Sequence, residues 1–210
     1  MDNSKQSLNL NDYGYSKPSR LRAVSLFVWE LAKVAIISSA IIIPVRYFLI
    51  QPFYVKGASM EPNFYDHEYL IVDELSYRLG EPNRGDIVVF KYPRDPRQYF
   101  IKRVIGLPGE RVMIGDGQIT IVNKNGTTTL EETYLPAELL TELPAKGYGD
   151  VTLAIDEYFL LGDNRNQSLD SRVFGPVKKD FIVGRTWIRG WPFDRLTVFS
   201  APQYGTTTNK

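Results

Sequence analysis

The sequence has 210 residues, of which one is histidine and none is cysteine, and its formal net charge is +1. This balance argues against nucleic acid as a partner, because tracking phosphates needs a clustered excess of Lys and Arg. Absence of cysteine excludes disulfides, thiolate metal sites and a cysteine nucleophile. With one histidine and no HExxH pattern, we also expect no metal and no other cofactor.

Residues 1–23 are polar and carry the cations Lys17, Arg20 and Arg22 near their end. Such a segment cannot bury enough apolar surface to fold alone, so we expect a flexible tail. Positive charges that flank a hydrophobic segment keep their side of it in the cytoplasm. The tail is therefore expected to be cytoplasmic.

Residues 24–50 are hydrophobic, and two serines are the only interruptions within 34–43. A span needs about 20 mostly apolar residues, a length reached here if Lys33 and Arg46 snorkel to opposite interfaces. A core or amphipathic helix is disfavoured because the run is apolar on all sides. A cleavable signal peptide is disfavoured by the polar lead-in and the lack of an Ala-x-Ala site. We expect one membrane anchor, with residues 51–210 on the extracytoplasmic side.

After the anchor the chain consists of short β-type runs separated by turn residues. Such runs occur at 69–72, 86–90, 99–105, 119–122, 158–161 and 181–187. The segments Gly115-Asp116-Gly117 and Lys124-Asn125-Gly126 are strong hairpin signals. No sustained helical period follows the anchor, so we expect a mostly β domain. Residues 112–157 contain both hairpin signals and none of the candidate chemistry, which predicts an inserted β subdomain.

Ser59 is a candidate nucleophile because it lies among small residues in Gly57-Ala58-Ser59-Met60-Glu61-Pro62. The one histidine, His67, lies in the polar turn Tyr65-Asp66-His67-Glu68, where we expect an ordinary surface side chain. A Ser-His-Asp triad is therefore not expected. The remaining candidate for the base is a lysine, and Ser-Lys pairs are a known variant of this arrangement.

Lys102 is the candidate base because it lies in the apolar run 99–105, where a lysine charge is costly. On a strand, Phe100, Lys102 and Val104 share one face. Burial beside these side chains would lower the lysine pKa and make the amine a competent base.

A third stretch, 162–172, reads Gly-Asp-Asn-Arg-Asn-Gln-Ser-Leu-Asp-Ser-Arg and is denser in polar side chains than a turn requires. In this order, and behind an N-terminal anchor, the three motifs resemble those of bacterial type I signal peptidases. These are membrane-bound serine proteases that remove signal peptides from exported proteins. The resemblance covers about residues 50–110 and 158–178 together with the anchor.

The resemblance implies a signal-peptidase-like β fold with Ser59 as nucleophile and Lys102 as general base. It also implies that Ser168 hydrogen-bonds the lysine amine and that Asp170 and Arg172 form a supporting ion pair. An exposed loop ion pair stabilises little by itself, so we expect this pair to act by fixing the loop. Arg103 and Asp163 are further candidates for the polar network, with partners that the sequence leaves open.

The oxyanion position departs from the Gram-negative pattern, where a serine hydroxyl stands two residues before the nucleophile. Here that residue is Gly57, which offers only its backbone amide. The resemblance then implies an oxyanion hole made of main-chain donors, including the Ser59 amide.

Substrate selection is expected from bulky apolar walls that leave room for Ala, Gly or Ser. The residues that match pocket positions of the family are Val55, Met60, Phe64, Phe100 and Ile101. An extended substrate would pair with the strands beside Ser59 and Lys102 and place alternate side chains in pockets. Such a site would select Ala-x-Ala.

The expected partners are exported preproteins and the lipid bilayer, with no obligate oligomer. The membrane is expected to be an inner or plasma membrane or a thylakoid membrane, and the single anchor resembles Gram-positive, cyanobacterial and plastid members. Two alternatives remain. One is the self-cleaving SOS repressor family, which also uses a Ser-Lys pair on a β fold. The other is a membrane-tethered β domain that binds a partner without chemistry.

Overall fold

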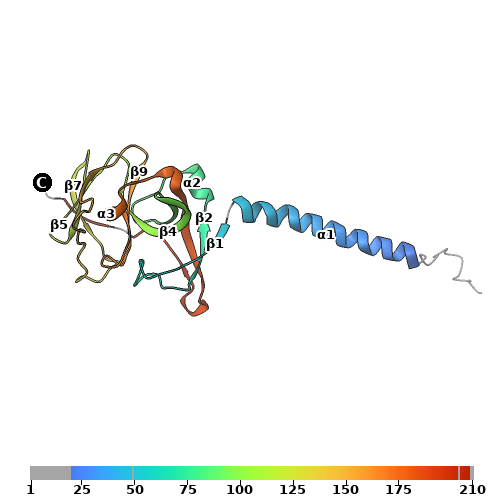
Figure 1. Cartoon of the computed structure of the whole chain (residues 1–210). Helices are drawn as coiled ribbons and strands as arrows, with labels where there is room; N and C mark the ends of the chain where they lie inside the picture. Colours follow the sequence, from blue (N-terminus) through green and yellow to red (C-terminus); the bar gives the residue numbers. More distant parts are fainter. Residues whose placement is uncertain (1–19, 49, 203, 209–210) are drawn as a thin grey trace, which may run out of the picture. The chain divides into compact units, whose positions relative to one another are not determined.

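The computed structural model describes residues 20–48, 50–202 and 204–208. The chain divides into two compact units, Met1–Pro44 and Val45–Lys210, and the labelled strands all belong to the second unit (Figure 1). The elements in chain order are α1 (Arg20–Phe48), β1 (Ile50–Tyr54), β2 (Tyr69–Asp73), α2 (Leu75–Leu79), β3 (Ile87–Tyr92), β4 (Asp95–Gly106), β5 (Arg111–Gly115), β6 (Gln118–Asn123), β7 (Gly126–Glu131), β8 (Asp150–Thr152), β9 (Glu157–Leu161), α3 (Ser171–Phe174), β10 (Val177–Lys178), η2 (Lys179–Phe181), β11 (Ile182–Trp191), η3 (Phe193–Arg195), β12 (Thr197–Val198) and β13 (Gly205–Thr208).

Helix α1 contains an apolar segment, Arg20–Pro44, that is long enough to cross a bilayer. Its 25 residues include an 18-residue window of mean hydropathy 2.0, none of it buried. Lys33 Nζ donates to Glu30 Oε1 at 2.6 Å, so these charges neutralise each other within one helical turn. The described part of the helix, from Arg20, includes residues that precede the expected anchor at 24–50, and Arg and Leu among them are good helix formers. Lys17 and the rest of residues 1–19 lie outside the described residues.

The larger sheet has eight antiparallel strands in the order β1-β2-β11-β3-β4-β9-β10, with β12 paired to β11. The long strand β4 pairs with β3 from Asp95 to Arg103, but with β9 only from Arg103 onward. β1 pairs with β2 alone among the described strands. The first half of β4 and the outer side of β1 therefore have backbone edges with no strand partner among the described residues.

Side chains on the two faces of β4 belong to two separate hydrophobic clusters. Phe100 and Val104 join the cluster around Val88 and Phe90, as their shared face predicts. Ile101 packs instead on a cluster formed by Val55, Met60, Phe64, Leu70 and Ile87. Lys102 thus lies on a strand that is fixed by apolar packing on both faces.

The smaller sheet has five strands in the order β13-β7-β6-β5-β8. Asp116 and Gly117 join β5 to β6 with positive φ values of +52° and +75°, as a two-residue hairpin turn requires. The strands β5 to β8 lie between Arg111 and Thr152, in the region where we expected an inserted subdomain. The fifth strand, β13, comes from the C-terminal end and pairs with β7, which the sequence did not indicate. The prediction of a mostly β domain is confirmed.

Candidate active site

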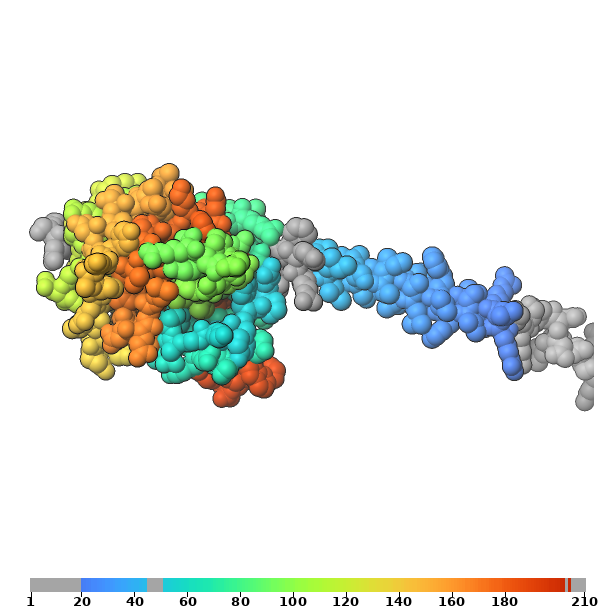
Figure 2. Space-filling model, viewed as in Figure 1, coloured from blue at the N-terminus to red at the C-terminus, as the bar shows by residue number. Residues whose placement is uncertain are grey.

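Segments that are far apart in the sequence meet at one groove of the second unit. The groove has a volume of about 330 Å³ and is lined by residues 53–59, residues 99–102, Gln167 and Leu169. Figure 2 shows these three parts of the chain adjoining on one face, in cyan, green and orange. Ser59 and Lys102 both line this groove.

Lys102 and Ser59 are in direct contact, since Lys102 Nζ lies 2.7 Å from Ser59 Oγ. The amine also donates to the backbone oxygen of Ile101 at 2.8 Å, and it lies 5.5 Å from the ring centroid of Phe100. Lys102 is 3% exposed. Burial lowers the pKa of Lys102 to about 8, while the carboxylates of Asp170 and Asp163 act in the opposite direction. A substantial fraction of the amine is therefore neutral near pH 8 and able to accept a proton.

The turn before the nucleophile depends on a glycine. Gly57 has a φ of +93°, a conformation that strains residues with a side chain. Its amide donates to Asp66 Oδ1 at 3.0 Å, and this bond lowers the pKa of the Asp66 carboxyl. The expected role of Gly57 as an oxyanion donor is therefore corrected, because its N–H is already bound. The Ser59 amide forms no hydrogen bond within the described part of the chain.

Asn164, to which the sequence analysis gave no role, bonds the backbone on both sides of the Ser59 amide. Its side-chain Nδ2 donates to the oxygen of Ala58 at 3.1 Å. Its own amide donates to the oxygen of Ser59 at 3.1 Å. The polar density of residues 162–172 was the only sequence signal for such contacts.

The expected ion pair of the third motif is present and buried. Arg172 donates to both oxygens of Asp170, from Nε at 2.9 Å and from Nη2 at 2.8 Å. Asp170 also accepts from the Gly162 amide at 3.1 Å, and Arg172 donates to the Glu142 oxygen at 2.9 Å. Both side chains are 3% exposed or less, so the pair is not an exposed bridge of little worth. Removing one partner of a buried pair leaves a charge uncompensated and costs about 3–5 kcal/mol.

A second buried pair lies next to the lysine in the sequence. Arg103 donates to the two oxygens of Asp163 at 2.8 and 2.6 Å, and Asn63 Nδ2 donates to Asp163 at 2.9 Å. Arg165 forms ion-paired hydrogen bonds with Glu132. The predicted insertion therefore contributes contacts to the third motif, although we expected no chemistry there.

Ser168 does not form the hydrogen bond that the resemblance implied. Its Oγ is buried and has no hydrogen-bond partner among the described residues, and the amine of Lys102 bonds Ser59 and Ile101 instead. The hydroxyl packs against Gly162, where a Cβ atom would overlap it. Ser168 also lines a separate cavity of about 680 Å³ beside residues 138–144.

Three of the five predicted pocket residues line the groove. Val55, Phe100 and Ile101 do so, whereas Met60 and Phe64 belong to the buried cluster and are at most 1% exposed. The turn directs these two side chains into the core, which corrects their assignment to the pocket wall. Apolar lining residues that the sequence analysis missed are Phe53, Leu70, Val89, Tyr99 and Leu169.

His67 lies in an exposed turn, with a φ of +69°. Tyr54 is hydrogen-bonded to its Nδ1, and Asp66 Oδ2 lies 3.4 Å from its Nε2. Neither Ser59 nor Lys102 is a hydrogen-bond partner of His67 in the described part of the chain. Within residues 20–48, 50–202 and 204–208, no group of three or more His, Cys, Asp or Glu side chains is arranged to hold a metal ion.

Comparison with known proteins supports the resemblance. The family model described as signal peptidase, peptidase S26, matches residues 28–191. A probable signal peptidase I-2 of Synechocystis sp. is 38% identical over 173 residues, which cover 80% of this chain and 75% of that protein. Signal peptidase I T of Bacillus subtilis is 34% identical over 169 residues, covering 80% and 87%. A crystal structure of a signal peptidase I from Enterococcus faecalis V583 is 36% identical, covers 50% of this chain and 97% of that one, and has a TM-score of 0.41.

Proposed function

The chain belongs to the signal peptidase, peptidase S26 family, and from this premise we propose that Ser59 is its nucleophile and Lys102 its general base. Proteins of this family remove signal peptides from preproteins, and the chain is a serine endopeptidase with this activity. The assignment of the two residues depends on one observation, the 2.7 Å contact between Lys102 Nζ and Ser59 Oγ in an apolar groove.

In the first step, neutral Lys102 accepts the hydroxyl proton of Ser59 while Oγ attacks the carbonyl carbon of the scissile bond. A serine hydroxyl is a weak nucleophile without such a base. The tetrahedral intermediate carries a negative charge on its oxygen, for which we assign the Ser59 amide as donor. The protonated lysine then gives its proton to the departing amine of the mature protein. The signal peptide remains bound to Ser59 Oγ as an ester.

In the second step, Lys102 is neutral again and removes a proton from a water molecule, which attacks the ester carbon. The lysine returns this proton to Ser59 Oγ as the tetrahedral species collapses. One amine thus serves as base and acid in both steps, which requires a pKa near the working pH. The buried Arg103–Asp163 and Arg172–Asp170 pairs each combine opposite charges, although their carboxylates still act to raise the pKa of the amine.

The groove supports cleavage after small side chains. Val55, Phe100 and Ile101 supply apolar walls of the groove, and we propose that they select a small side chain such as Ala, Gly or Ser. The open backbone edges of β1 and of the first half of β4 border the same groove, so an extended peptide has strand edges to pair with. We assign an Ala-x-Ala-like site on this basis.

Helix α1 and membership of the signal peptidase family support a membrane-anchored enzyme. We propose a single-pass topology with the N-terminus in the cytoplasm, because Arg20 and Arg22 flank that end of the apolar segment. The domain formed by residues 51–210 is then extracytoplasmic, and the membrane is an inner, plasma or thylakoid membrane. We also propose that no obligate oligomer is needed, since one chain supplies both members of the dyad.

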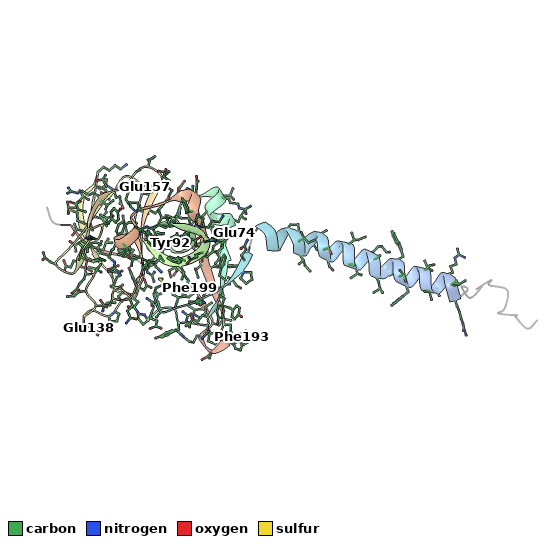
Figure 3. The ribbon with its side chains drawn as sticks, viewed as in Figure 1. Glu74, Tyr92, Glu138, Glu157, Phe193 and Phe199 are labelled. Carbon is green, nitrogen blue, oxygen red and sulfur yellow. The ribbon has the colours of Figure 1, made fainter. Side chains whose placement is uncertain are left out.

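The second unit has an exposed apolar edge of its own, at the end of β11 and in the turn that follows. Trp191 is 49% exposed and Phe193 is 71% exposed. Figure 3 shows Phe193 at the margin of the unit and Phe199 further in, where Phe199 packs on Phe64. Exposed apolar patches mark partner or membrane surfaces, and Trp favours the lipid–water interface. This edge supports a role for the bilayer as a partner of the catalytic unit as well as of the anchor.

The test of the dyad is cleavage of a labelled preprotein by detergent-solubilised enzyme. We expect Ser59→Ala and Lys102→Ala each to abolish cleavage, because nucleophile and base act as a unit. Lys102→Arg should fail as well, since a guanidinium stays protonated at any useful pH. Lys91→Ala, at an exposed lysine on the adjacent strand, and His67→Ala are controls that should retain activity. Full activity of either Lys102 variant would refute the dyad, and inhibition by a chelator would indicate a metal-dependent route.

A further inference from the structure

Asn164 contacts both backbone carbonyls that bracket the Ser59 amide, and we propose that it positions this amide as the oxyanion donor. The proposal rests on Ser59 as the nucleophile. It gives Asn164 no contact with the reacting atoms, so Asn164 is a positioning residue and not a catalytic one.

The contacts come from two groups of the same residue. Asn164 Nδ2 donates to the Ala58 oxygen at 3.1 Å, and the Asn164 amide donates to the Ser59 oxygen at 3.1 Å. The Ala58 oxygen also accepts from the Glu61 amide at 3.2 Å, within the turn itself. The two hydrogen bonds from Asn164 attach the turn that carries the nucleophile to the loop after β9, and the Asp163 amide adds a third bond, to Met60 Sδ at 3.5 Å.

The direction of the Ser59 amide follows from peptide geometry. The Ala58 carbonyl and the Ser59 N–H belong to one planar trans peptide unit, so they point to opposite sides. Because the carbonyl is held toward Asn164, the N–H is aimed away from it. That N–H forms no hydrogen bond within the described part of the chain, while the Gly57 amide is already bound to Asp66. The Ser59 amide is therefore available as a donor for an oxyanion at this turn.

Asn164 is itself held in the required orientation. Its Oδ1 accepts from the Gln167 amide at 3.2 Å, which directs the NH₂ group of the side chain to the Ala58 oxygen. The neighbouring Asp163 is fixed by the buried Arg103, and the Gly162 amide is fixed by Asp170. The loop that carries Asn164 is thus anchored by both buried ion pairs of the site.

An oxyanion donor acts on the transition state and not on the bound substrate, so its misdirection lowers kcat with little change in KM. Complete loss of one donor reduces kcat by about 10²–10³-fold. The bond from Glu61 to the Ala58 oxygen remains when Asn164 is changed, so the carbonyl is only partly released. We therefore expect a smaller loss, on the order of 10- to 100-fold.

The test compares Asn164→Asp and Asn164→Ala with Asn166→Ala in the full chain. Aspartate keeps the shape but places an oxygen against the Ala58 oxygen, and alanine removes the donor without adding charge. Asn166 is an exposed asparagine in the same loop and serves as the matched control. For each variant, kcat and KM are measured with a labelled Ala-x-Ala peptide, together with the pH profile. Binding of a peptide aldehyde, which forms a tetrahedral adduct on serine, is compared with binding of an unreactive peptide of the same sequence.

We expect Asn164→Ala to lose kcat and aldehyde affinity by a similar factor at every pH, and Asn164→Asp to lose at least as much, while the unreactive peptide binds as before and Asn166→Ala is unchanged. Recovery of the Asn164→Ala rate at higher pH would show that Asn164 acts through the lysine pKa, and equal weakening of both peptides would show a role in substrate binding. Either result, or unchanged kinetics, overturns the proposal. An active Ser59→Ala variant would instead overturn the proposed dyad, so the two failures are distinguishable.

Discussion

Lys102 combines two properties that rarely occur together in one lysine, deep burial and contact with a nucleophile. Burial lowers its pKa because water no longer solvates the ammonium form, and the nearby carboxylates only partly oppose this effect. The proton-accepting form is neutral, so it becomes more abundant as the pH rises through the pKa.

The first prediction concerns the pH dependence of cleavage. We expect kcat/KM for a soluble peptide to rise with pH through a single ionisation near 8 and then level off, since kcat/KM reports the free enzyme. His67→Ala should have the same profile. An acidic limb near the usual histidine pKa of about 6.5, lost in His67→Ala, would show that the base has been misassigned.

The second prediction concerns Ser168, whose buried Oγ has no partner among the described residues. A buried hydroxyl without a hydrogen bond lowers the stability of the folded protein by about 1–3 kcal/mol. Catalytic hydrogen bonds often form only when substrate is bound, so we infer that Ser168 Oγ gains its partner in the substrate complex. We expect Ser168→Ala to keep or raise the melting temperature while turnover falls about 10- to 100-fold, as the loss of a positioning bond allows.

Ser171→Ala is the matched control for Ser168. Ser171 Oγ accepts from the buried Leu160 amide at 2.9 Å, so this variant leaves a donor unsatisfied. It should lower the melting temperature by several degrees, at about 2–4 °C per kcal/mol for a chain of this size. If Ser168→Ala instead loses stability and retains full turnover, Ser168 is a structural residue.

At the scale of elements, the site depends on how closely the end of β9 approaches the turn that carries Ser59. The loop after β9 begins with Gly162, and a Cβ built there would overlap Ser168 Oγ and the Ser59 backbone oxygen. A backbone oxygen cannot move aside without shifting the nucleophile. The glycine is therefore required by contact and not by an unusual φ.

The third prediction follows from this approach of β9 to the turn. Gly162→Ala should reduce turnover by at least 10-fold, because small displacements at a reacting centre are costly. Gly115→Ala is the control, since a Cβ on that β5 glycine meets nothing within 4 Å. Peptide-cleavage assays and melting curves of the two variants check the prediction, and normal turnover of Gly162→Ala would contradict the close packing.

At the scale of the whole molecule, the two units have separable tasks, anchoring by α1 and cleavage by the domain that begins at β1. Ser59 follows Pro44, the end of the apolar segment, by 15 residues. An anchored enzyme and a membrane-inserted preprotein share one thin layer, which raises their effective concentration.

The fourth prediction is that deletion of residues 1–48, which keeps β1 intact, leaves a β-rich domain that cleaves a short Ala-x-Ala peptide normally. The same variant should process membrane-inserted preproteins poorly, because it loses the concentration effect of the anchor. Circular dichroism and parallel assays of both substrates check this result. Equal rates of the full chain and the shortened chain on inserted preproteins would show that the anchor is dispensable.

The fifth prediction concerns orientation in sealed vesicles. Protease added to the extracytoplasmic face should digest the catalytic domain and spare an epitope placed at the N-terminus. This result is expected because Arg20 and Arg22 at the start of α1 keep that end in the cytoplasm. The same treatment after detergent should digest both. Protection of the catalytic domain in intact vesicles would reverse the proposed topology.

The sequence by itself determined the family, the enzymatic function, the apolar helix and the mostly β class, all of which are confirmed. Each depends on local signals, because the length of a hydrophobic segment, the alternation of a strand and a short motif can all be recognised from residues that are neighbours in the sequence. Ser59 and Lys102 were predicted for the same reason, and the structure brings them into contact, while their roles stay predictions.

Only the tertiary structure decided which side chains meet. Asp163 pairs with Arg103, Asn164 holds the nucleophile turn, and β13 closes the smaller sheet from the far end of the chain. Met60 and Phe64 point into the core, although their motif had suggested the pocket wall. These outcomes depend on how the sheet curves and where distant loops approach one another. A contact between residues 60 or 100 positions apart produces no periodic pattern from which a single sequence could predict it.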